Sequence, residues 1–129
     1  MADHHNLPDF LVLNSTVQHY NWGGEEFIPS LLGIDNEEKR PYAELWMGAH
    51  PKSPSVTEIN GQEFPLDKLF EIHASELMGK KAAEKFDNRL PFLLKVLDVN
   101  KMLSIQVHPT IAQAEIGFAR ENSLGIPLS

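Results

Sequence analysis

Hydrophobic and polar residues alternate along residues 102–108. A β-strand points successive side chains to opposite faces, so this alternation predicts a strand with one apolar and one polar face. The apolar face comprises Leu103, Ile105 and Val107. The polar face comprises Ser104, Gln106 and His108. Because buried polar groups are costly unless they are satisfied, the polar face predicts contact with a metal ion or a polar ligand.

The apolar run at residues 92–97 predicts a preceding strand, and this strand contains one charged residue, Lys95. A hairpin that turns at Val99 and Asn100 would place Lys95 opposite Ser104, on the face of the polar residues. Buried there, the lysine would need a charged or polar partner. At the edge of a sheet it would instead extend its ammonium group into solvent, and the spacing leaves both alternatives open.

The rest of the chain predicts strands with helices inserted between them. Further strands are expected at residues 10–13 and 43–47, and a hairpin at residues 56–64 with Asn60 and Gly61 at its turn. Helices are expected at residues 28–34, 66–77 and 80–86. A last helix would begin with Pro109 as its first residue and end near Asn122. We therefore expect a mainly β fold with inserted helices (α+β), without the βαβ order of a parallel sheet.

Composition narrows the class of protein. The 129 residues, 42% of them hydrophobic, suffice for one domain or part of one. The net charge of −7 argues against nucleic acid and anionic membranes as partners.

The chain shows neither a signal peptide nor an apolar run of membrane-spanning length, so we expect a cytoplasmic location. Because cysteine is absent, a metal would have to use histidine, carboxylate or amide oxygen. Residues 1–9, with His4 and His5, are expected to be flexible.

Several polar residues allow a structural and a functional interpretation. A Gln-x-His pair is weak evidence for a metal site, because two ligands cannot close a tetrahedral site and a buried, hydrogen-bonded histidine is common. Glu44 shares a strand face with Trp46, so it could orient a ligand or pair with a lysine, and we favour a structural role. His50 and His73 are also interpreted as structural residues.

Four segments together resemble the amino-terminal part of the type I phosphomannose isomerases (mannose-6-phosphate isomerases). The segments are Gln18-His-Tyr-Asn-Trp-Gly23, Pro41-Tyr-Ala-Glu-Leu-Trp-Met-Gly-Ala-His-Pro51, Leu90-Pro-Phe-Leu-Leu-Lys-Val-Leu97 and Leu103-Ser-Ile-Gln-Val-His-Pro109. They occur in the order and at the spacing of the corresponding segments in the family. The resemblance extends over nearly the whole chain from Leu13 onward. Any one of them would be a weak signal, whereas the four together are specific.

The resemblance implies a zinc-dependent aldose–ketose isomerase that interconverts mannose 6-phosphate and fructose 6-phosphate and supplies GDP-mannose. It implies that residues 1–129 form the amino-terminal part of the catalytic domain, an incomplete piece of a cupin-like β-sandwich or jelly roll. Of the four ligands of one Zn²⁺ ion, two would be Gln106 and His108, and the others would lie beyond Ser129. Lys95 would be catalytic and would also bind substrate, together with Trp22 and Ser104. The expected partner is a small sugar phosphate, and the full-length form is expected to be a monomer.

Because part of the site would lie outside this chain, three interpretations remain open. The chain could be a truncated piece of the isomerase that is inactive alone, a non-catalytic fragment, or a small sugar- or metal-binding cupin module. An incomplete sandwich would also leave strand edges unpaired and the apolar face of residues 102–108 uncovered. We therefore expect partial order or aggregation of the isolated chain.

Overall fold

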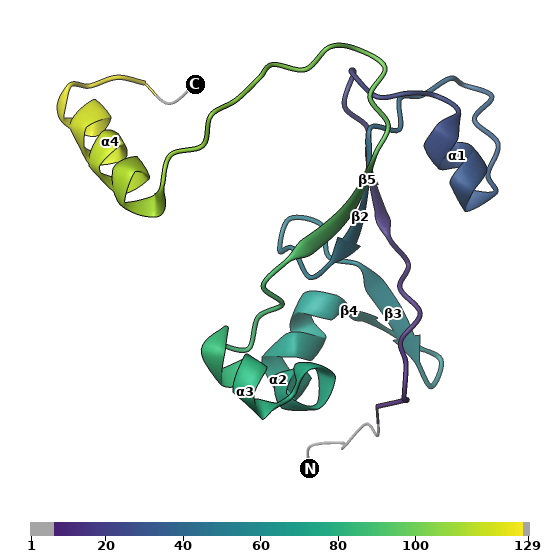
Figure 1. Ribbon diagram of the computed structural model, residues 1–129. Coiled ribbons are helices and arrows are strands. Elements are labelled where there is room, and N and C mark those ends of the chain that lie inside the picture. Colours follow the sequence, from purple (N-terminus) through teal and green to yellow (C-terminus); the bar gives the residue numbers. More distant parts are fainter. Residues whose placement is uncertain (1–6, 128–129) are drawn as a thin grey trace.

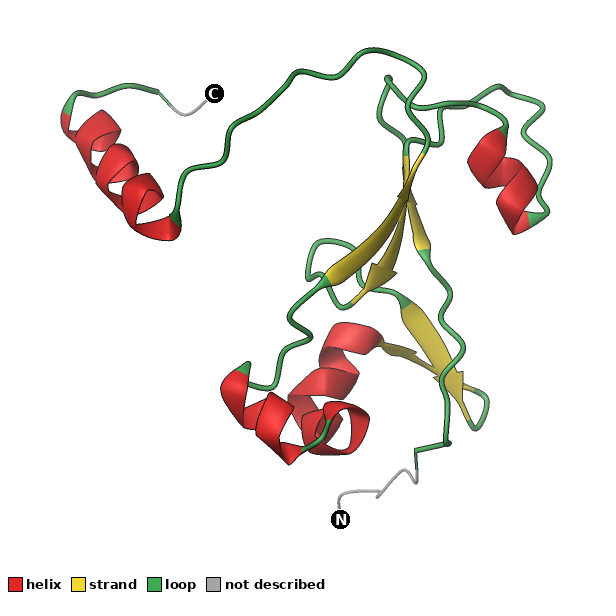
Figure 2. Cartoon of the chain, in the orientation of Figure 1, coloured by secondary structure: helices red, strands yellow, loops and turns green. Residues whose placement is uncertain are grey.

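The computed structural model describes residues 7–127 of the chain, and in them antiparallel sheets alternate with helices. The strands are β1 (Thr16–Gln18), β2 (Glu44–Gly48), β3 (Val56–Ile59), β4 (Gln62–Pro65) and β5 (Leu93–Leu97). The helices are α1 (Phe27–Leu32), α2 (Leu66–Met78), α3 (Lys80–Lys85) and α4 (Ile111–Ser123). Figure 1 shows α2 and α3 beside the β3-β4 hairpin, whereas α4 stands apart from both sheets. This arrangement confirms the expected α+β class (Figure 2).

Local sequence signals explain the hairpin and several helix ends. Asn60 and Gly61 both have positive φ angles, 54° and 79°, as a two-residue turn of type I′ requires. Gly33 ends α1 in the left-handed conformation, with φ 66°. Asp67 lies in the first turn of α2, where its negative charge favours the helix dipole. The predictions for the hairpin and for α1, α2 and α3 are therefore confirmed within one or two residues.

The main hydrophobic core lies between the hairpin and helices α2 and α3. Its buried members are Ile59, Leu66, Leu69, Phe70, Ala74 and Ala83. Leu11 and Leu13 pack against this core from the first part of the chain. The core thus fixes the hairpin and α2 as one unit, and this unit is inserted between β2 and β5.

The prediction of a first strand at residues 10–13 is wrong. The first strand is β1, which pairs with β2 and places Val17 opposite Leu45. Just before it, the main chain of Asn14 exchanges hydrogen bonds of 2.7 and 3.0 Å with Val56. The start of the chain is therefore attached to the hairpin, and its leucines serve as core residues instead of strand residues.

The predicted hairpin between residues 92–97 and 102–108 is also wrong. β5 pairs with β2, in the sheet order β1-β2-β5, and Lys95 lies opposite Trp46 rather than Ser104. No turn forms at residues 99–100, because the amides of Asn100 and Lys101 donate to the carbonyl oxygen of Trp22, at 2.9 and 3.1 Å. Residues 102–109 consequently have neither helix nor strand structure.

The last helix begins two residues later than predicted. Thr110, not a residue before Pro109, is the N-cap of α4, and its hydroxyl accepts a hydrogen bond from the Gln113 amide at 3.3 Å. The Gln113 side chain accepts in return from the Thr110 amide at 2.9 Å, which completes a capping box. None of the helices in residues 7–127 is long and apolar enough to cross a membrane.

Candidate active site

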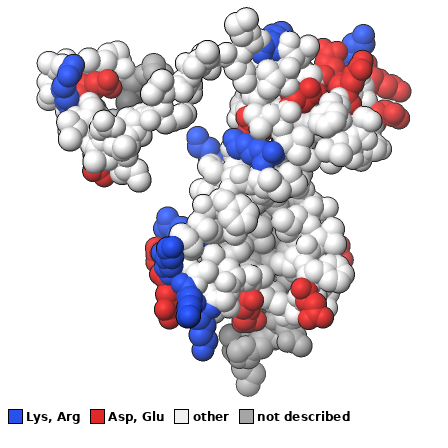
Figure 3. Space-filling view, viewed as in Figure 1, with Lys and Arg blue, Asp and Glu red and all other residues white. Residues whose placement is uncertain are grey.

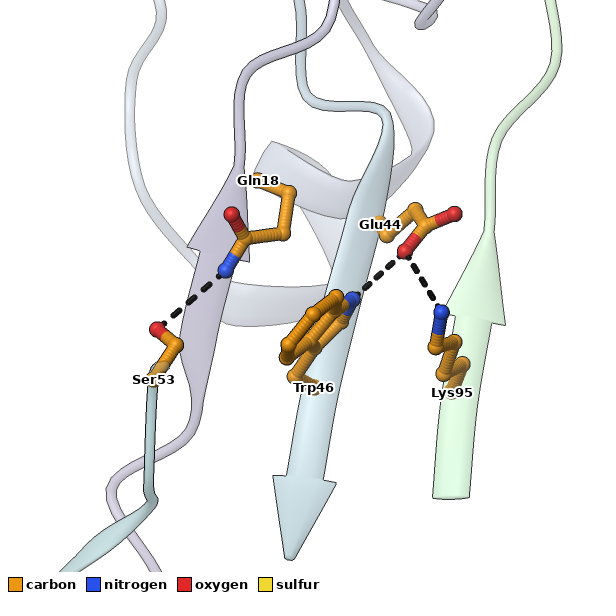
Figure 4. A network of polar contacts seen from close by, with 5 residues as sticks. All are labelled: Gln18, Glu44, Trp46, Ser53 and Lys95. Carbon is orange, nitrogen blue, oxygen red and sulfur yellow. Dashed lines mark hydrogen bonds and ion pairs between the residues drawn. The ribbon is translucent and has the colours of Figure 1, made fainter. Parts of the chain in front are cut away.

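One face of the β1-β2-β5 sheet carries a group of polar side chains. Cross-strand partners share a face, and the register places Gln18 opposite Glu44 and Trp46 opposite Lys95. Because residues two apart in a strand also share a face, all four side chains lie on the same side of the sheet (Figure 4). The sheet thus gathers residues that are up to 77 positions apart in the sequence.

Lys95 is held by two neighbours on β2. Its Nζ donates a hydrogen bond to Oε2 of Glu44 at 3.1 Å and lies 4.6 Å from the centroid of the Trp46 ring. The same Glu44 oxygen accepts a hydrogen bond from Nε1 of Trp46. Figure 4 shows the carboxylate between the indole and the ammonium group. A cation–π contact and a charge-assisted hydrogen bond therefore fix the position of one ammonium group.

Glu44, Trp46 and Lys95 form a polar network, and its members differ in burial. Glu44 and Trp46 are both buried, whereas the side chain of Lys95 remains 35% exposed. The structure therefore combines the two alternatives for Lys95, because its ammonium group is paired with a carboxylate and still accessible. A buried carboxylate needs such partners, since an unpaired charge in this position would be strongly destabilising.

A loop covers the β1 side of the polar face. Nε2 of Gln18 donates to Oγ of Ser53 at 3.2 Å, and Oγ1 of Thr16 donates to the carbonyl oxygen of Pro54 at 3.3 Å. The ring of His50 packs edge-on against Trp46, with ring centroids 5.0 Å apart. The contact with Trp46 supports the structural interpretation of His50.

Trp22 lies near the end of β5. Its ring stacks on that of Tyr20, with centroids 5.6 Å apart, and its carbonyl oxygen holds the amides of Asn100 and Lys101. Gly23 follows in close contact with Ala43, where an added Cβ would come within 2.6 Å of the Ala43 backbone. The Trp22 loop therefore determines where the chain goes after β5.

The structure does not bring the other predicted site residues to Lys95. Ser104, Gln106 and His108 are all exposed, in the stretch without secondary structure. The amide oxygen of Gln106 and the imidazole of His108 are suitable in kind as zinc ligands. Within residues 7–127, no group of three or more His, Cys, Asp or Glu side chains could hold a metal ion. These two donors therefore fit half of a four-coordinate zinc site.

Glu44 and Trp46 are the members of the network that the sequence did not assign to the site. The sequence did show that both lie on one strand face, which is the signal that could have found them. What it lacked was the pairing of β2 with β5, which supplies the lysine. His4 and His5 lie outside the described residues.

A hollow of about 420 Å³ lies elsewhere, between the loop after β2, the start of α2 and the loop after α3. Its lining includes His50, Asp67, Glu71 and Arg89. Lys95 and Glu44 are not among the lining residues, and His50, which packs against Trp46, is the lining residue that contacts the polar network.

Residues 10–124 match the sequence model of the family "Phosphomannose isomerase type I, catalytic domain". The chain therefore belongs to this family. It is 47% identical over 117 residues to the mannose-6-phosphate isomerase of Salmonella typhimurium, and the match covers 90% of this chain and 30% of that protein. It is 42% identical over 104 residues to the enzyme of the same name from Schizosaccharomyces pombe, covering 75% of this chain and 24% of that protein. The chain thus spans about 30% or less of the length of these relatives.

Solved structures agree with the family assignment. A zinc-bound mannose 6-phosphate isomerase is similar with a TM-score of 0.76 and 45% identity, over 91% of this chain and 30% of that one. The Salmonella typhimurium enzyme bound to substrate (f6p) and a zinc atom has a TM-score of 0.76 and 46% identity, over 91% and 29% of the two chains. The fold of this chain is therefore that of one part of a mannose 6-phosphate isomerase.

Proposed function

We propose that this chain is the amino-terminal part of the catalytic domain of a zinc-dependent aldose–ketose isomerase. The enzyme would interconvert mannose 6-phosphate and fructose 6-phosphate in the cytoplasm and so contribute to the supply of GDP-mannose. The observation that carries this proposal is the family match over residues 10–124. The partner would be a small sugar phosphate, not nucleic acid or membrane, and the complete enzyme would be a monomer.

Lys95 would stabilise negative charge on the sugar. Aldose–ketose isomerisation moves a proton between two neighbouring carbons through an enediol, so charge develops on the sugar oxygens. An ammonium group has three N–H donors, and Glu44 engages one of them in the contact at 3.1 Å. The others remain available because the side chain is partly exposed. Lys95 would therefore bind and orient the sugar and stabilise the negative charge that develops on it.

Gln106 and His108 would provide two of the four zinc ligands, and Ser104 and Trp22 would contact the sugar. Zinc would supply Lewis-acid polarisation of the sugar oxygens when bound. Both donors are uncharged, which leaves the ion more electrophilic than carboxylate ligands would. Residues 102–108 stand free of the sheet in this chain. In the complete site they would lie beside Lys95, as their alternation of polar and apolar side chains permits.

A chimera would test whether these residues serve the reaction. In it, residues 10–124 replace the matching segment of the Salmonella typhimurium enzyme, which is 47% identical. We expect the chimera to isomerise mannose 6-phosphate, and Lys95→Met to lower kcat/KM by about 100-fold or more, the usual effect of removing one oxyanion donor. His108→Ala should lower the zinc content measured by metal analysis. Lys80→Met, at an exposed position of α3, is the matched control and should leave activity unchanged.

The 129-residue chain alone should show little or no isomerase activity and should bind zinc weakly, because it would contribute two of four ligands. Robust activity of the purified chain would contradict this part of the proposal. One equivalent of tightly bound zinc in the isolated chain would favour a small metal-binding module instead. An inactive chimera that folds and binds zinc would contradict the assignment of an isomerase.

A further inference from the structure

The position of the Lys95 ammonium group depends on two residues of β2. A lysine side chain is a flexible four-carbon stem, so an ammonium group without partners occupies many positions. Here Nζ lies 3.1 Å from Oε2 of Glu44 and 4.6 Å from the centroid of the Trp46 ring. Among the described residues, Glu44 is the one hydrogen-bond partner of this ammonium group. The two contacts therefore hold a flexible cation at one point on the face of the sheet.

Of these two contacts, the hydrogen bond to Glu44 determines the position more closely. The face of an indole attracts a cation over a wide area, whereas a hydrogen bond requires a defined distance and direction. Without the carboxylate, the ammonium group could move across the Trp46 ring and still keep its cation–π contact. Glu44 is therefore the residue that fixes where the positive charge lies.

Glu44 is itself held in place. It lies on β2, the central strand of the sheet, where it is paired with Gln18 on one side and Leu97 on the other. Its carboxylate also accepts a hydrogen bond from Nε1 of Trp46, and the ring of His50 packs edge-on against that indole. A carboxylate fixed by its strand and by a packed indole can hold a flexible cation, because the carboxylate itself does not move.

The burial of Glu44 separates it from the other acidic residues of the chain. Acidic side chains gather on the surface around α1 in Figure 3, whereas Glu44 is 8% exposed. Stability alone is a weak explanation for a buried carboxylate, because desolvation offsets much of the attraction within a buried ion pair. Contact with a sugar is a weak explanation as well, since the oxygen that faces Lys95 already accepts two hydrogen bonds.

We propose that Glu44 is a positioning residue of the isomerase, which fixes the ammonium group of Lys95 and acts on the reaction only through it. This proposal rests on the proposed function, in which Lys95 stabilises negative charge on the sugar. A donor contributes to catalysis only when it lies within hydrogen-bond distance of the oxygen that becomes charged. Glu44 engages one N–H of the ammonium group and so directs the other two before the sugar binds.

A kinetic double-mutant cycle tests this role in the chimera of residues 10–124 with the Salmonella typhimurium enzyme. The variants are Glu44→Gln, Lys95→Met and the double variant, with kcat and KM for mannose 6-phosphate measured separately. Glu44→Gln should lower kcat by about 10-fold or more and change KM by less than about 3-fold, because the contact of Lys95 with the sugar strengthens in the transition state. In the Lys95→Met background, Glu44→Gln should change kcat by less than about 2-fold, since no ammonium group remains to be positioned.

Glu58→Gln is the matched control, because Glu58 is an exposed carboxylate on β3, and it should leave kcat and KM unchanged. Urea denaturation and metal analysis establish that each variant folds and keeps its zinc. If Glu44→Gln does not fold, Trp46→Phe tests the same chain of contacts. It keeps a ring beside Lys95 but removes the N–H that holds the carboxylate, so kcat should fall by about 3-fold or more, again only when Lys95 is present.

Three results with an active wild-type chimera would overturn the positioning role and leave the proposed function intact. The first is an unchanged kcat in folded Glu44→Gln. The second is an equal loss of kcat with and without Lys95, which would mean that Glu44 acts independently of the lysine. The third is a loss of zinc from Glu44→Gln, which would place its effect at the metal. A wild-type chimera that folds and binds zinc but is inactive would instead overturn the proposed function, and this proposal with it.

Discussion

The pair formed by Glu44 and Lys95 gives the sharpest test of the structure. Its Nζ and Oε2 atoms are 3.1 Å apart, which corresponds to a Coulomb attraction of about 5 kcal/mol at an effective dielectric constant of about 20. Desolvation of the buried carboxylate and the partial exposure of the lysine offset much of this attraction. We therefore expect a net coupling free energy of about 1–2 kcal/mol between the two side chains.

A double-mutant cycle isolates this coupling free energy, because the other effects of each single substitution cancel in the comparison. Glu44→Gln keeps the size of the side chain and an acceptor for Trp46, and Lys95→Met keeps the apolar stem. The free energy of unfolding of the wild type, both single variants and the double variant would be measured by urea denaturation, followed by tryptophan fluorescence. Trp46 contacts both substituted residues, so its emission also reports on the local structure.

The exposed ion pair between Lys68 and Glu71 on α2 is the control. Its atoms are only 2.7 Å apart, but both side chains are 60% exposed. The hydrogen bond that Lys68 donates to Glu71 raises the pKa of Lys68, but solvent screens an exposed pair so strongly that its contribution to stability is often undetectable. Two independent sites show a coupling below about 0.3 kcal/mol. A coupling free energy that small between Glu44 and Lys95 would refute the network at the sheet face.

Three further predictions concern the Trp22 loop, the hydrophobic core and the N-cap of α4. Gly23→Ala should lower the free energy of unfolding, measured by urea denaturation, by about 1–3 kcal/mol, because the added methyl group would meet the backbone of Ala43. Gly117→Ala is the control, since the space around Gly117 is open and no such loss is expected. Ile59→Ala should cost about 2–5 kcal/mol in the same assay, since Ile59 is 4% exposed in the core, and a loss below 1 kcal/mol would contradict its burial. Thr110→Ala removes the capping box and should reduce the helix signal in circular dichroism, whereas Thr110→Ser should retain it.

Local features of the fold could be predicted from the sequence. The Asn60-Gly61 turn, the end of α1 at Gly33 and the break between α2 and α3 depend on residues a few positions apart. Their conformations follow from the φ angles that asparagine and glycine tolerate. The strand at β5 was also predicted, because a continuous apolar run is typical of a buried strand.

The pairing of strands could not be predicted in the same way. An alternating pattern indicates that residues 102–108 could form a strand, but a strand exists only where a partner offers free hydrogen-bonding groups. β2 occupies one edge of β5, and the pairing of Glu44 with Leu97 joins residues 53 positions apart. The sequence therefore predicted Lys95 as a site residue but could not predict its partners on β2. The roles of Lys95, Trp22, Ser104, Gln106 and His108 remain predictions.

The register of β2 and β5 has a consequence for how this region can change in evolution. Gly48 and Leu93 are cross-strand partners, so the intervening residues 49–92 leave and rejoin the sheet at adjacent points. The buried members of the main core all lie within that segment, and Leu11 and Leu13 pack against them from outside it. Insertions or deletions there could accumulate without shifting Lys95 relative to Trp46. The segment therefore has the properties of an interchangeable module, whereas a single-residue change in length within β2 or β5 would move the lysine to the opposite face.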